Sequence, residues 1–383
     1  MCKRIFKEQT TTEGVVPFFK IGTFGGNPDA YISRELFEEY KSKFQYPEVG
    51  DMLISASGTI GRTVEYTGKD EYFQDSNIVW FKHDNRIENS FLRYIYQIVK
   101  WDGIEGSTIK RLYNDNFLKT KFTMPSVAEQ KKLGEFFKQL DHLITLYQRK
   151  CDMLKNLKAS MLTKMFPKEG ESVPEIRFKG FTEPWEQRKL LSCIEKITDF
   201  RGRTPKKLGM DWSESGYLAL SALNVKDGYI DFSQDVHYGE QALYDKWMSG
   251  NELHKGQVLF TTEAPMGNVA QVPDNKRYIL SQRTIAFDVK EDIITENFLA
   301  TLLRSPAVFN TLTSLSSGGT AKGVSQKSLA GVDIQIPVEL REQELLATYF
   351  ANLDNLITLH QREWKGKRLW IIINCLLNTI KNG

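Results

Sequence analysis

The chain has few of the residues that build metal centres. It contains four cysteines (Cys2, Cys151, Cys193, Cys375) and five histidines, with no Cys-x-x-Cys, His-x-His or His-Glu-x-x-His spacing. Scattered cysteines of this kind are typical of a reduced, cytoplasmic protein. The sequence therefore predicts a cytoplasmic protein with no metal site of its own.

Long apolar runs and a strong charge imbalance are also missing. The opening MCKRIFKEQT has no apolar stretch behind its charges, so it does not look like a signal peptide. The longest apolar run, near Leu369–Ile373, is too short to span a bilayer, and no membrane partner is expected. The net charge is only +3, so a polyanionic partner can be argued only from local clusters of charge.

Recognisable catalytic motifs are absent as well. Gly318–Gly323 has the glycine spacing of a phosphate-binding loop, but Val324 stands where the lysine is required. Asn27–Ala30 begins like an amino-methyltransferase motif and lacks its second proline and its aromatic residue. No nucleophile elbow occurs. We therefore predict no catalytic residue and no cofactor bound by this chain.

What the chain does contain is a long internal repeat. Residues 140–150 read LDHLITLYQRK and residues 353–363 read LDNLITLHQRE, with eight identities in eleven positions at a shift of 213. A proline and then Glu-Gln precede each copy, at Pro125 and at Pro337. A repeat of this length exceeds a solenoid unit and indicates two whole modules, each a globular part followed by a helix.

The globular parts are rich in short β-like runs broken by Gly, Asn and Asp, which predicts strands of mixed or antiparallel sheets. They align piece by piece. Phe18–Thr23 matches Tyr217–Ala222 at a shift of 199, and the runs after Gly50 and Gly256 match at 206, with Gly61 opposite Gly267. Gly106–Lys110 matches Gly318–Lys322 at a shift of 212. Because the shift grows along the chain, we expect the two modules to share a scaffold and to differ in the length of their loops.

The helix after each module carries an apolar stripe at heptad spacing, which is typical of a helix pair. A helix from Val127 to Met165 would be about 58 Å long, at about 1.5 Å per residue, and needs a partner such as its own copy. The predicted seam residues are Leu133, Phe137, Leu140, Leu143, Ile144, Leu154, Leu346, Phe350, Leu353, Leu356 and Ile357. The fold class is therefore α+β: two β-rich domains, each followed by a long helix, with pseudo-two-fold symmetry.

The predicted boundaries are 1–125 for the first domain, 126–166 for the central helix, 167–190 for a proline-bearing linker, 191–337 for the second domain and 338–383 for the last helix. The second domain is preceded by a segment, near Glu175–Phe200, that has no counterpart before the first. We therefore expect the first domain to be short at its N-terminus.

Basic turns and glycine-rich loops are the candidate DNA contacts. Positive charge opens both modules, and Gly, Thr and Lys in the matching loops suit phosphate binding. Polar residues just ahead of strands, such as Gln74, Asn77 and Arg283, suit adenine or guanine edges. For any single candidate, an ordinary surface position or a helix cap is an equally good explanation. The interpretation as DNA contacts is favoured because both modules place such residues at matching positions. The candidates are Lys3, Arg4, Lys7, Arg62, Gln74, Asn77, Thr108, Lys110, Arg111, Arg201, Arg203, Thr204, Lys206, Lys207, Gln282, Arg283, Thr320 and Lys322.

Together, the Leu-Asp-x-Leu-Ile-Thr-Leu-x-Gln-Arg helices, the Glu-Gln openings and the segment VPEIRFKGFTEPWEQRKL (residues 173–190) resemble the specificity (S, or HsdS) subunit of type I restriction–modification systems. The resemblance covers essentially the whole chain, apart from the segment that normally precedes the first domain. It implies a non-catalytic DNA reader with two target recognition domains, one for each half of a split, asymmetric site. It also implies that the two helices pack antiparallel as a coiled-coil spacer.

The partners implied by the resemblance are double-stranded DNA, two methyltransferase (M) subunits that use S-adenosylmethionine on adenine, and restriction (R) subunits that use ATP and Mg²⁺. Two other functions stay open from the sequence. The chain could be the recognition part of a fused restriction-methyltransferase, which would need a catalytic motif, or a coiled-coil protein-binding module, whose binding would be insensitive to salt.

Overall fold

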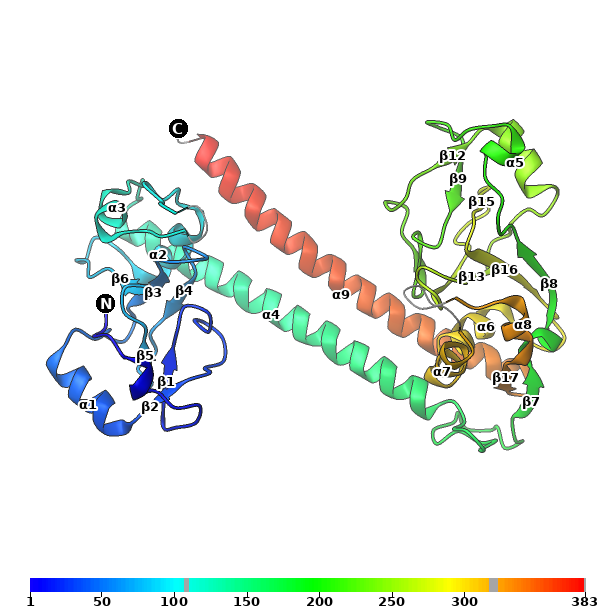
Figure 1. The fold of residues 1–383 in the computed structure, drawn as a ribbon, viewed down its shortest axis with the longest axis horizontal. Coiled ribbons are helices and arrows are strands. Elements are labelled where there is room, and N and C mark those ends of the chain that lie inside the picture. Colours follow the sequence, from blue (N-terminus) through cyan, green and yellow to red (C-terminus); the bar gives the residue numbers. More distant parts are fainter. Residues whose placement is uncertain (107–109, 317–322, 382–383) are drawn as a thin grey trace. The chain divides into compact units, whose positions relative to one another are not determined.

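The computed structural model describes residues 1–106, 110–316 and 323–381, and in the last helix it describes side chains only as far as residue 363. The chain divides into two compact units, Met1–Leu146 and Tyr147–Gly383, which are taken one at a time. Figure 1 shows both, with labels on many of their helices and strands.

Unit 1 contains two small three-stranded sheets. The first has the order β2-β1-β5, with β1 antiparallel to β2 and parallel to β5. The second has the order β4-β3-β6 and is antiparallel. The strands are β1 Val16–Phe19, β2 Tyr31–Ile32, β3 Met52–Ser55, β4 Thr63–Glu65, β5 Tyr72–Phe73 and β6 Ile78–Trp80. All of β3 is buried, which is why this strand reads as a continuous apolar run.

Short helices connect and cover these strands. The Ser33 hydroxyl caps the first of them by accepting a hydrogen bond from the Leu36 N–H at 3.2 Å. On the buried face of this helix, Phe37 is fully buried in a hydrophobic cluster that also contains Tyr72. The helices of unit 1 are η1 Lys7–Gln9, α1 Arg34–Lys43, α2 Asn89–Ile98, α3 Asn114–Lys119 and the first part of α4 Val127–Lys164.

Unit 2 contains counterparts of the two sheets of unit 1, together with further strands and helices. Its sheets have the orders β12-β9-β15, β14-β13-β16-β8, β10-β11 and β17-β7. The strands are β7 Glu186–Lys189, β8 Ile194–Asp199, β9 Tyr217–Leu220, β10 Val225–Lys226, β11 Tyr229–Ile230, β12 Tyr238–Gly239, β13 Val258–Thr261, β14 Val269–Gln271, β15 Ile279–Leu280, β16 Thr284–Val289 and β17 Asp333–Ile336. The helices are η2 Leu190–Cys193, η3 Lys206–Leu208, α5 Gln241–Met248, α6 Glu296–Leu303, α7 Pro306–Ser314, α8 Gln326–Gly331 and α9 Leu340–Lys381.

The sheet topology confirms that the two modules share one scaffold. The order β2-β1-β5 corresponds to β12-β9-β15, and in both sheets the last pair is parallel. The order β4-β3-β6 corresponds to β14-β13-β16, at the predicted shift of 206. Gly61 and Gly267 both adopt positive φ, at 93° and 91°, and both N–H groups bond back to the central strand, which explains the glycine at each turn.

One predicted alignment is wrong by two residues. Phe18 pairs with Tyr72, and it is Ala219, not Tyr217, that pairs with the corresponding Ile279, so the shift at this strand is 201 and not 199. Side chains on a strand alternate between two faces, so a slip of two residues leaves the apolar pattern unchanged. The sequence pattern therefore fixes the face of this strand and not its register.

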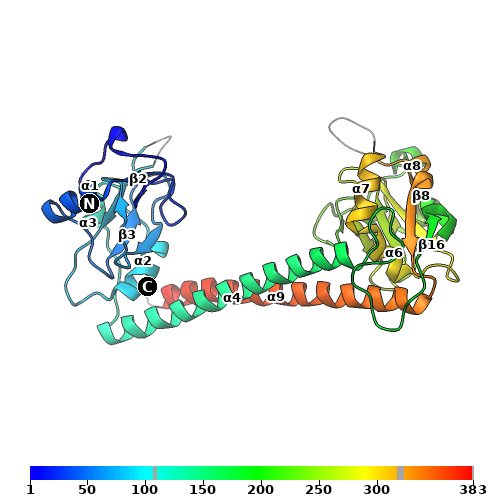
Figure 2. The same cartoon turned by 90° about the horizontal axis from the view of Figure 1, so that it is seen from below.

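Within unit 2, the C-terminal part of α4 and the N-terminal part of α9 pack antiparallel, as expected. The Cys151 thiol lies 3.9 Å from the Ile357 carbonyl oxygen, and the Lys158 ammonium lies 2.6 Å from an Asp354 carboxylate oxygen. As the residue number rises along α4, the number of the contacting residue on α9 falls, so the two helix parts run in opposite directions. Both views show these helix parts side by side (Figures 1 and 2).

The residues predicted for the seam differ in their burial. Leu346, Phe350, Leu353 and Ile357 are buried, and Leu133, Phe137, Leu140, Ile144 and Leu154 are half-buried. Leu143 and Leu356, at matching positions of the repeat, are 39% and 43% exposed, and their place in the seam stays a prediction. A helix neighbour covers only a narrow stripe, and heptad counting does not identify which leucines fall outside it.

Much of the apolar stripe joins each helix to its own globular part. In unit 1 the Phe137 ring lies 4.9 Å from the Tyr94 ring of α2. In unit 2, Leu346, Phe350 and Leu353 belong to the same buried cluster as Phe298 of α6. The long helices are therefore fixed to the modules as well as to each other.

A buried glutamine makes the same junction in both units. In unit 1 the Gln130 amide donates to the Arg86 and Pro125 carbonyls at 3.0 and 2.9 Å and accepts from the Glu88 N–H at 3.0 Å. In unit 2 the amide of Gln343, which is 0% exposed, donates to the Ile293 and Pro337 carbonyls at 2.9 and 3.0 Å and accepts from the Thr295 N–H at 3.0 Å. These contacts explain why a glutamine follows a proline at the start of each long helix.

The repeated aspartate of the helices also contacts the modules. The Tyr94 hydroxyl donates to Asp141 at 2.9 Å, and burial together with this bond raises the pKa of the tyrosine. In unit 2 the corresponding Asp354 accepts from Arg304, at the end of α6, at 2.9 Å as well as from Lys158. The aspartate therefore ties each long helix to the module that precedes it.

Candidate nucleic-acid interface

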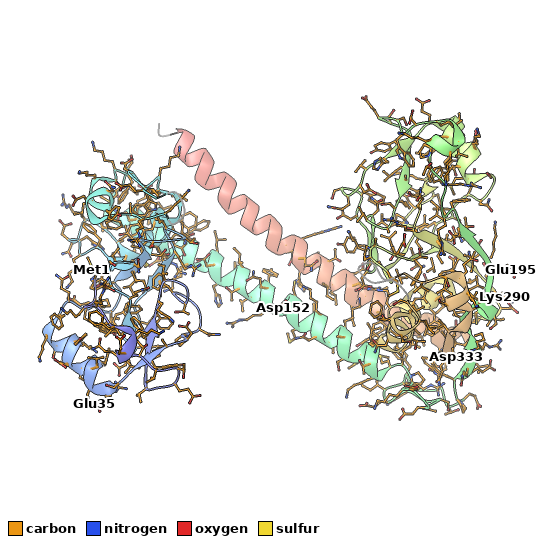
Figure 3. The ribbon with its side chains drawn as sticks, viewed as in Figure 1. Met1, Glu35, Asp152, Glu195, Lys290 and Asp333 are labelled. Carbon is orange, nitrogen blue, oxygen red and sulfur yellow. The ribbon has the colours of Figure 1, made fainter. Side chains whose placement is uncertain are left out.

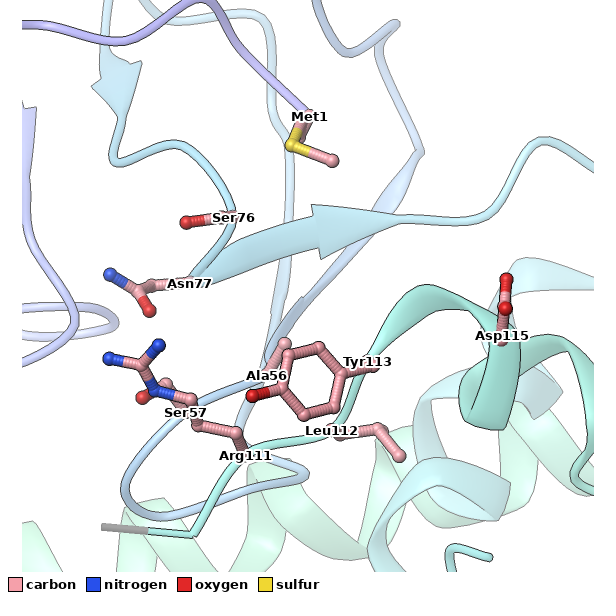
Figure 4. Close-up of a pocket in the computed structure, with 9 residues that line it drawn as sticks. All are labelled: Met1, Ala56, Ser57, Ser76, Asn77, Arg111, Leu112, Tyr113 and Asp115. Carbon is pink, nitrogen blue, oxygen red and sulfur yellow. The ribbon is translucent and has the colours of Figure 1, made fainter. Parts of the chain in front are cut away.

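The end of β3 in unit 1 borders a pocket of about 350 Å³. The Ala56 N–H donates to the Asn77 carbonyl at 2.8 Å, and Ser57 pairs as a bridge with Arg111. Figure 4 shows the Asn77 amide and the Arg111 guanidinium directed into the same space. Two of the predicted DNA-binding residues, far apart in sequence, therefore line one pocket, with Ser57, Ser76 and Tyr113 beside them.

Unit 2 places different side chains on the same backbone. The Thr262 N–H donates to the Arg283 carbonyl at 2.8 Å, and Glu263 pairs as a bridge with Gly323, so Arg283 corresponds to Asn77 and Gly323 to Arg111. The Arg283 guanidinium forms an ion pair with Glu263 at 2.7 Å and both side chains are exposed. Arg283 also has a φ of 66°, which is unusual for a long side chain and costs conformational energy.

The basic turn of unit 2 lies beside this position. Gln282, next to Arg283, donates its amide to the Arg203 carbonyl, which brings residues 199–207 against the turn between β15 and β16. Arg201 pairs with Asp199 at 2.8 Å, and Lys207 donates to the Gly202 carbonyl at 2.7 Å. The Thr204 hydroxyl, just before η3, accepts from the Lys207 N–H at 3.2 Å, and the Lys206 side chain is exposed.

In unit 1 the basic N-terminal residues take a comparable place. Arg4 pairs with Asp75 at 2.9 Å, and the Lys3 carbonyl accepts from the Tyr72 hydroxyl at 3.1 Å, so this segment lies along the turn between β5 and β6. Lys7 is exposed in η1. The Lys110 carbonyl accepts from the Gly58 N–H at 2.9 Å, which brings Lys110 to the same end of β3 as Arg111.

Several candidate side chains have partners that the sequence did not reveal. The Gln74 amide oxygen accepts from the Ile21 N–H at 2.9 Å, and Arg62 donates to the Phe24 carbonyl at 2.9 Å. Arg203 donates to the Trp247 carbonyl and stacks 4.4 Å from the centre of the Phe200 ring. These groups hold loops together, so less of their hydrogen-bonding capacity is left for DNA.

Three candidates, Thr108, Thr320 and Lys322, lie outside the described residues. The pocket also includes residues that sequence reasoning missed. Ser57 and Tyr113 belong to no charged or glycine-rich pattern. The alignment could have found Ser57, because it stands opposite Glu263 at the shift of 206.

A family model described as the type I restriction modification DNA specificity domain matches residues 1–156 and 182–365. The chain belongs to this family. Its function as a specificity subunit of the type I restriction–modification class agrees with the resemblance seen in its repeat.

Relatives of the chain carry the same description. A putative type I restriction enzyme specificity subunit of Haemophilus influenzae is 55% identical over 144 residues, which cover 37% of this chain and 37% of that protein. The specificity subunit of the type I restriction enzyme MjaVIII of Methanocaldococcus jannaschii is 24% identical over 323 residues, covering 82% of this chain and 72% of that protein.

Solved structures share the fold of this specificity subunit. The S subunit of a type I restriction–modification system from M. genitalium matches with a TM-score of 0.57 and 12% identity, covering 96% of this chain and 89% of that one. A chain from a structure of type I R-M complex assembly and conformational transition matches with a TM-score of 0.51 and 13% identity, covering 93% and 88%. These matches confirm the predicted α+β architecture.

Two negative findings apply to the described part of this specificity subunit. No described helix has both the length and the apolar content needed to cross a bilayer. In residues 1–106, 110–316 and 323–381, no three His, Cys, Asp or Glu side chains gather as metal ligands would.

Proposed function

We propose that this specificity subunit reads a split, asymmetric DNA site, with one unit contacting each half. The observation that supports it is a matched backbone position with different side chains. Asn77 in unit 1 corresponds to Arg283 in unit 2, and the side chain beside it is Arg111 in unit 1 and Glu263 in unit 2. An asparagine suits adenine, an arginine suits guanine and a glutamate suits cytosine. The two units would therefore read different DNA sequences with the same backbone scaffold.

Contacts to phosphates would fix each unit on the duplex without reading sequence. Exposed cations close to the reading positions support this division. In unit 2 they are Lys206 and Arg201, although Arg201 must exchange its pairing with Asp199 for a phosphate. In unit 1 it is Lys110, next to Arg111, whereas Lys3 and Lys7 are exposed on the N-terminal segment, with the Lys3 ammonium 5.0 Å from the centre of the Phe44 ring.

The two long helices would act as the spacer that sets the gap between the half-sites. Helix α4 has 38 residues, which corresponds to about 57 Å at about 1.5 Å per residue. Half-sites one helical turn apart lie about 34 Å from each other on DNA, so a helix of this length can bridge them. The target recognition domains would correspond to residues 1–125 and 191–337, and residues 166–190, which fold onto unit 2, would complete the second.

Exposed leucines on the repeat support binding of M subunits. Leu143 and Leu146 are 39% and 46% exposed on α4, and their counterparts Leu356 and Leu359 are 43% and 51% exposed on α9. Apolar residues at the same exposed positions of two helices suit two copies of one partner. The M subunits would supply S-adenosylmethionine chemistry on adenine, and R subunits would supply cleavage with ATP and Mg²⁺.

Mapping adenine methylation in cells that carry the subunit with its M partner tests the proposal. We expect Asn77→Ala with Arg111→Ala to relax only one half-site, and Arg283→Ala to relax only the other, by about 1–3 kcal/mol per base pair. Glu135→Ala, at an exposed position of α4, is the control and should leave the motif unchanged.

The result that would refute the proposal is loss of sequence preference in both halves from a change in one unit. An unchanged motif after both sets of substitutions would equally refute the assigned reading positions. Binding of the complex to DNA should weaken steeply as salt rises, because phosphate contacts release counterions.

A further inference from the structure

One segment of unit 2, residues 177–199, completes that unit through three separate contacts. Arg177 binds Glu342 through two hydrogen bonds of 2.7 and 2.8 Å, and this pairing raises the pKa of the arginine. Strand β7 then pairs antiparallel with β17, from Asp333 opposite Lys189 to Ile336 opposite Glu186. Strand β8 finally pairs with β16 and extends the central sheet. Figure 3 labels Asp333 on β17 and Glu195 on β8.

Unit 1 has the counterpart of each contact surface. Residues 121–124 stand before Pro125 as β17 stands before Pro337, and Glu129 precedes Gln130 as Glu342 precedes Gln343. Strand β6 corresponds to β16. The three surfaces thus occupy the same places on the shared scaffold.

These surfaces are open within the described part of unit 1. Residues 121–124 are exposed and pair with no described strand, although their counterpart in unit 2 is a strand. Glu129 is exposed and forms no ion pair with a described residue, whereas Glu342 is 1% exposed. Strand β6 pairs only with β3 among the described strands, whereas β16 has neighbours on both sides.

The burial of core residues differs in the same way. Phe287 of β16, Leu329 of α8 and Ile294 are each 0% exposed. Their counterparts in unit 1, Phe81, Phe117 and Ile87, are only half-buried. In unit 2 these residues share a cluster with Leu190 and Cys193, both 0% exposed, which belong to the segment itself.

We propose that this face of unit 1, formed by residues 121–124, Glu129 and the outer edge of β6, is a docking site for an extended polypeptide segment with the chemistry of residues 177–199. The segment carries an arginine for Glu129, a strand for residues 121–124, two apolar side chains for the half-buried core and a second strand for β6. Addition of a strand to an open sheet edge is a recurrent mode of peptide recognition. An exposed edge with apolar residues behind it otherwise favours unspecific association.

The register makes the proposal specific. Transfer of the β17–β7 register places Lys121 opposite residue 189 of such a segment and Thr123 opposite residue 187. Because Lys189 pairs with Asp333 in unit 2, an acidic residue is expected at position 189 of a segment that binds beside Lys121. The arginine is nine residues upstream of the first strand position, as Arg177 is of Glu186. This inference concerns a protein partner and does not depend on which bases the subunit reads.

Binding of a synthetic peptide of residues 174–199 to the full chain tests the proposal by fluorescence anisotropy. The peptide carries Cys193→Ala, which removes the thiol and keeps an apolar side chain, and Lys189→Glu, which places an acidic residue opposite Lys121. We expect saturable binding that Arg177→Ala in the peptide, or Glu129→Gln in the protein, weakens about tenfold, since a charge-assisted pair is lost. Glu135→Gln, at another exposed α4 position, is the matched control and should leave binding unchanged.

Disulfide trapping tests where the peptide lies. Thr123→Cys in the protein should link to a Gln187→Cys peptide and not to an Arg188→Cys peptide, because neighbouring side chains on a strand point to opposite faces. Absence of binding, binding that ignores both Glu129→Gln and Arg177→Ala, or equal trapping by the two peptides would each overturn the proposal.

Discussion

The buried glutamine at each helix junction yields a prediction of stability. Replacing Gln343 with leucine removes two N–H donors and one acceptor, which leaves the Ile293 and Pro337 carbonyls and the Thr295 N–H without their partner. Each lost bond contributes about 1 kcal/mol net, and a buried group left unpaired costs about 1–3 kcal/mol. Allowing for the apolar contacts that leucine gains, we expect unit 2 to lose about 3–5 kcal/mol.

The same change in unit 1 should have a similar effect. Gln130 is 1% exposed and makes three bonds of the same kind, so Gln130→Leu should destabilise unit 1 by about 3–5 kcal/mol. Gln148→Leu, at an exposed position of α4, is the control and should change stability by less than about 0.5 kcal/mol.

Hydrogen exchange followed by mass spectrometry can assign each loss to its unit, whereas bulk unfolding of a chain with two units is not a single transition. Gln343→Leu should raise exchange near residues 293–299 and Gln130→Leu near residues 86–92. A loss below about 1 kcal/mol, or unchanged exchange at these segments, would refute the view that the glutamine holds each helix to its module.

Three further predictions concern the helices. Asp354→Leu should destabilise unit 2 by about 3 kcal/mol, measured as faster hydrogen exchange near residues 296–304, because the half-buried Lys158 and the Arg304 guanidinium lose a carboxylate partner; a loss below about 1 kcal/mol would contradict it. Leu143→Asp with Leu356→Asp should change stability by less than about 1 kcal/mol and abolish co-purification with the M subunit, whereas retained co-purification would exclude these leucines from that interface. Insertion of four residues in the exposed middle of α4 should change the gap between half-sites in the methylation motif, and an unchanged gap would rule out the spacer role.

The reading positions show why sequence alone could propose the site and not define it. The sequence identified Asn77, Arg111 and Arg283 from residue type and local context. It could not show that Gln74 bonds to Ile21, or that Arg203 bonds to Trp247, because those partners are distant in sequence. Hydrogen-bond partners of a polar side chain are set by tertiary packing, so which groups remain available for DNA follows only from the structure.

The internal repeat determined the architecture by itself. Eight identities in eleven positions at a shift of 213 established two modules, two long helices and their equivalence, since periodicity and length are properties of the sequence. Tertiary structure decided which leucines of that repeat are covered, the register of β1 and the different completion of the two units. These features depend on which surfaces meet in space, and the repeat carries no record of that: Leu140 and Leu353 stand in the same local sequence, yet Leu140 is half-buried and Leu353 is buried.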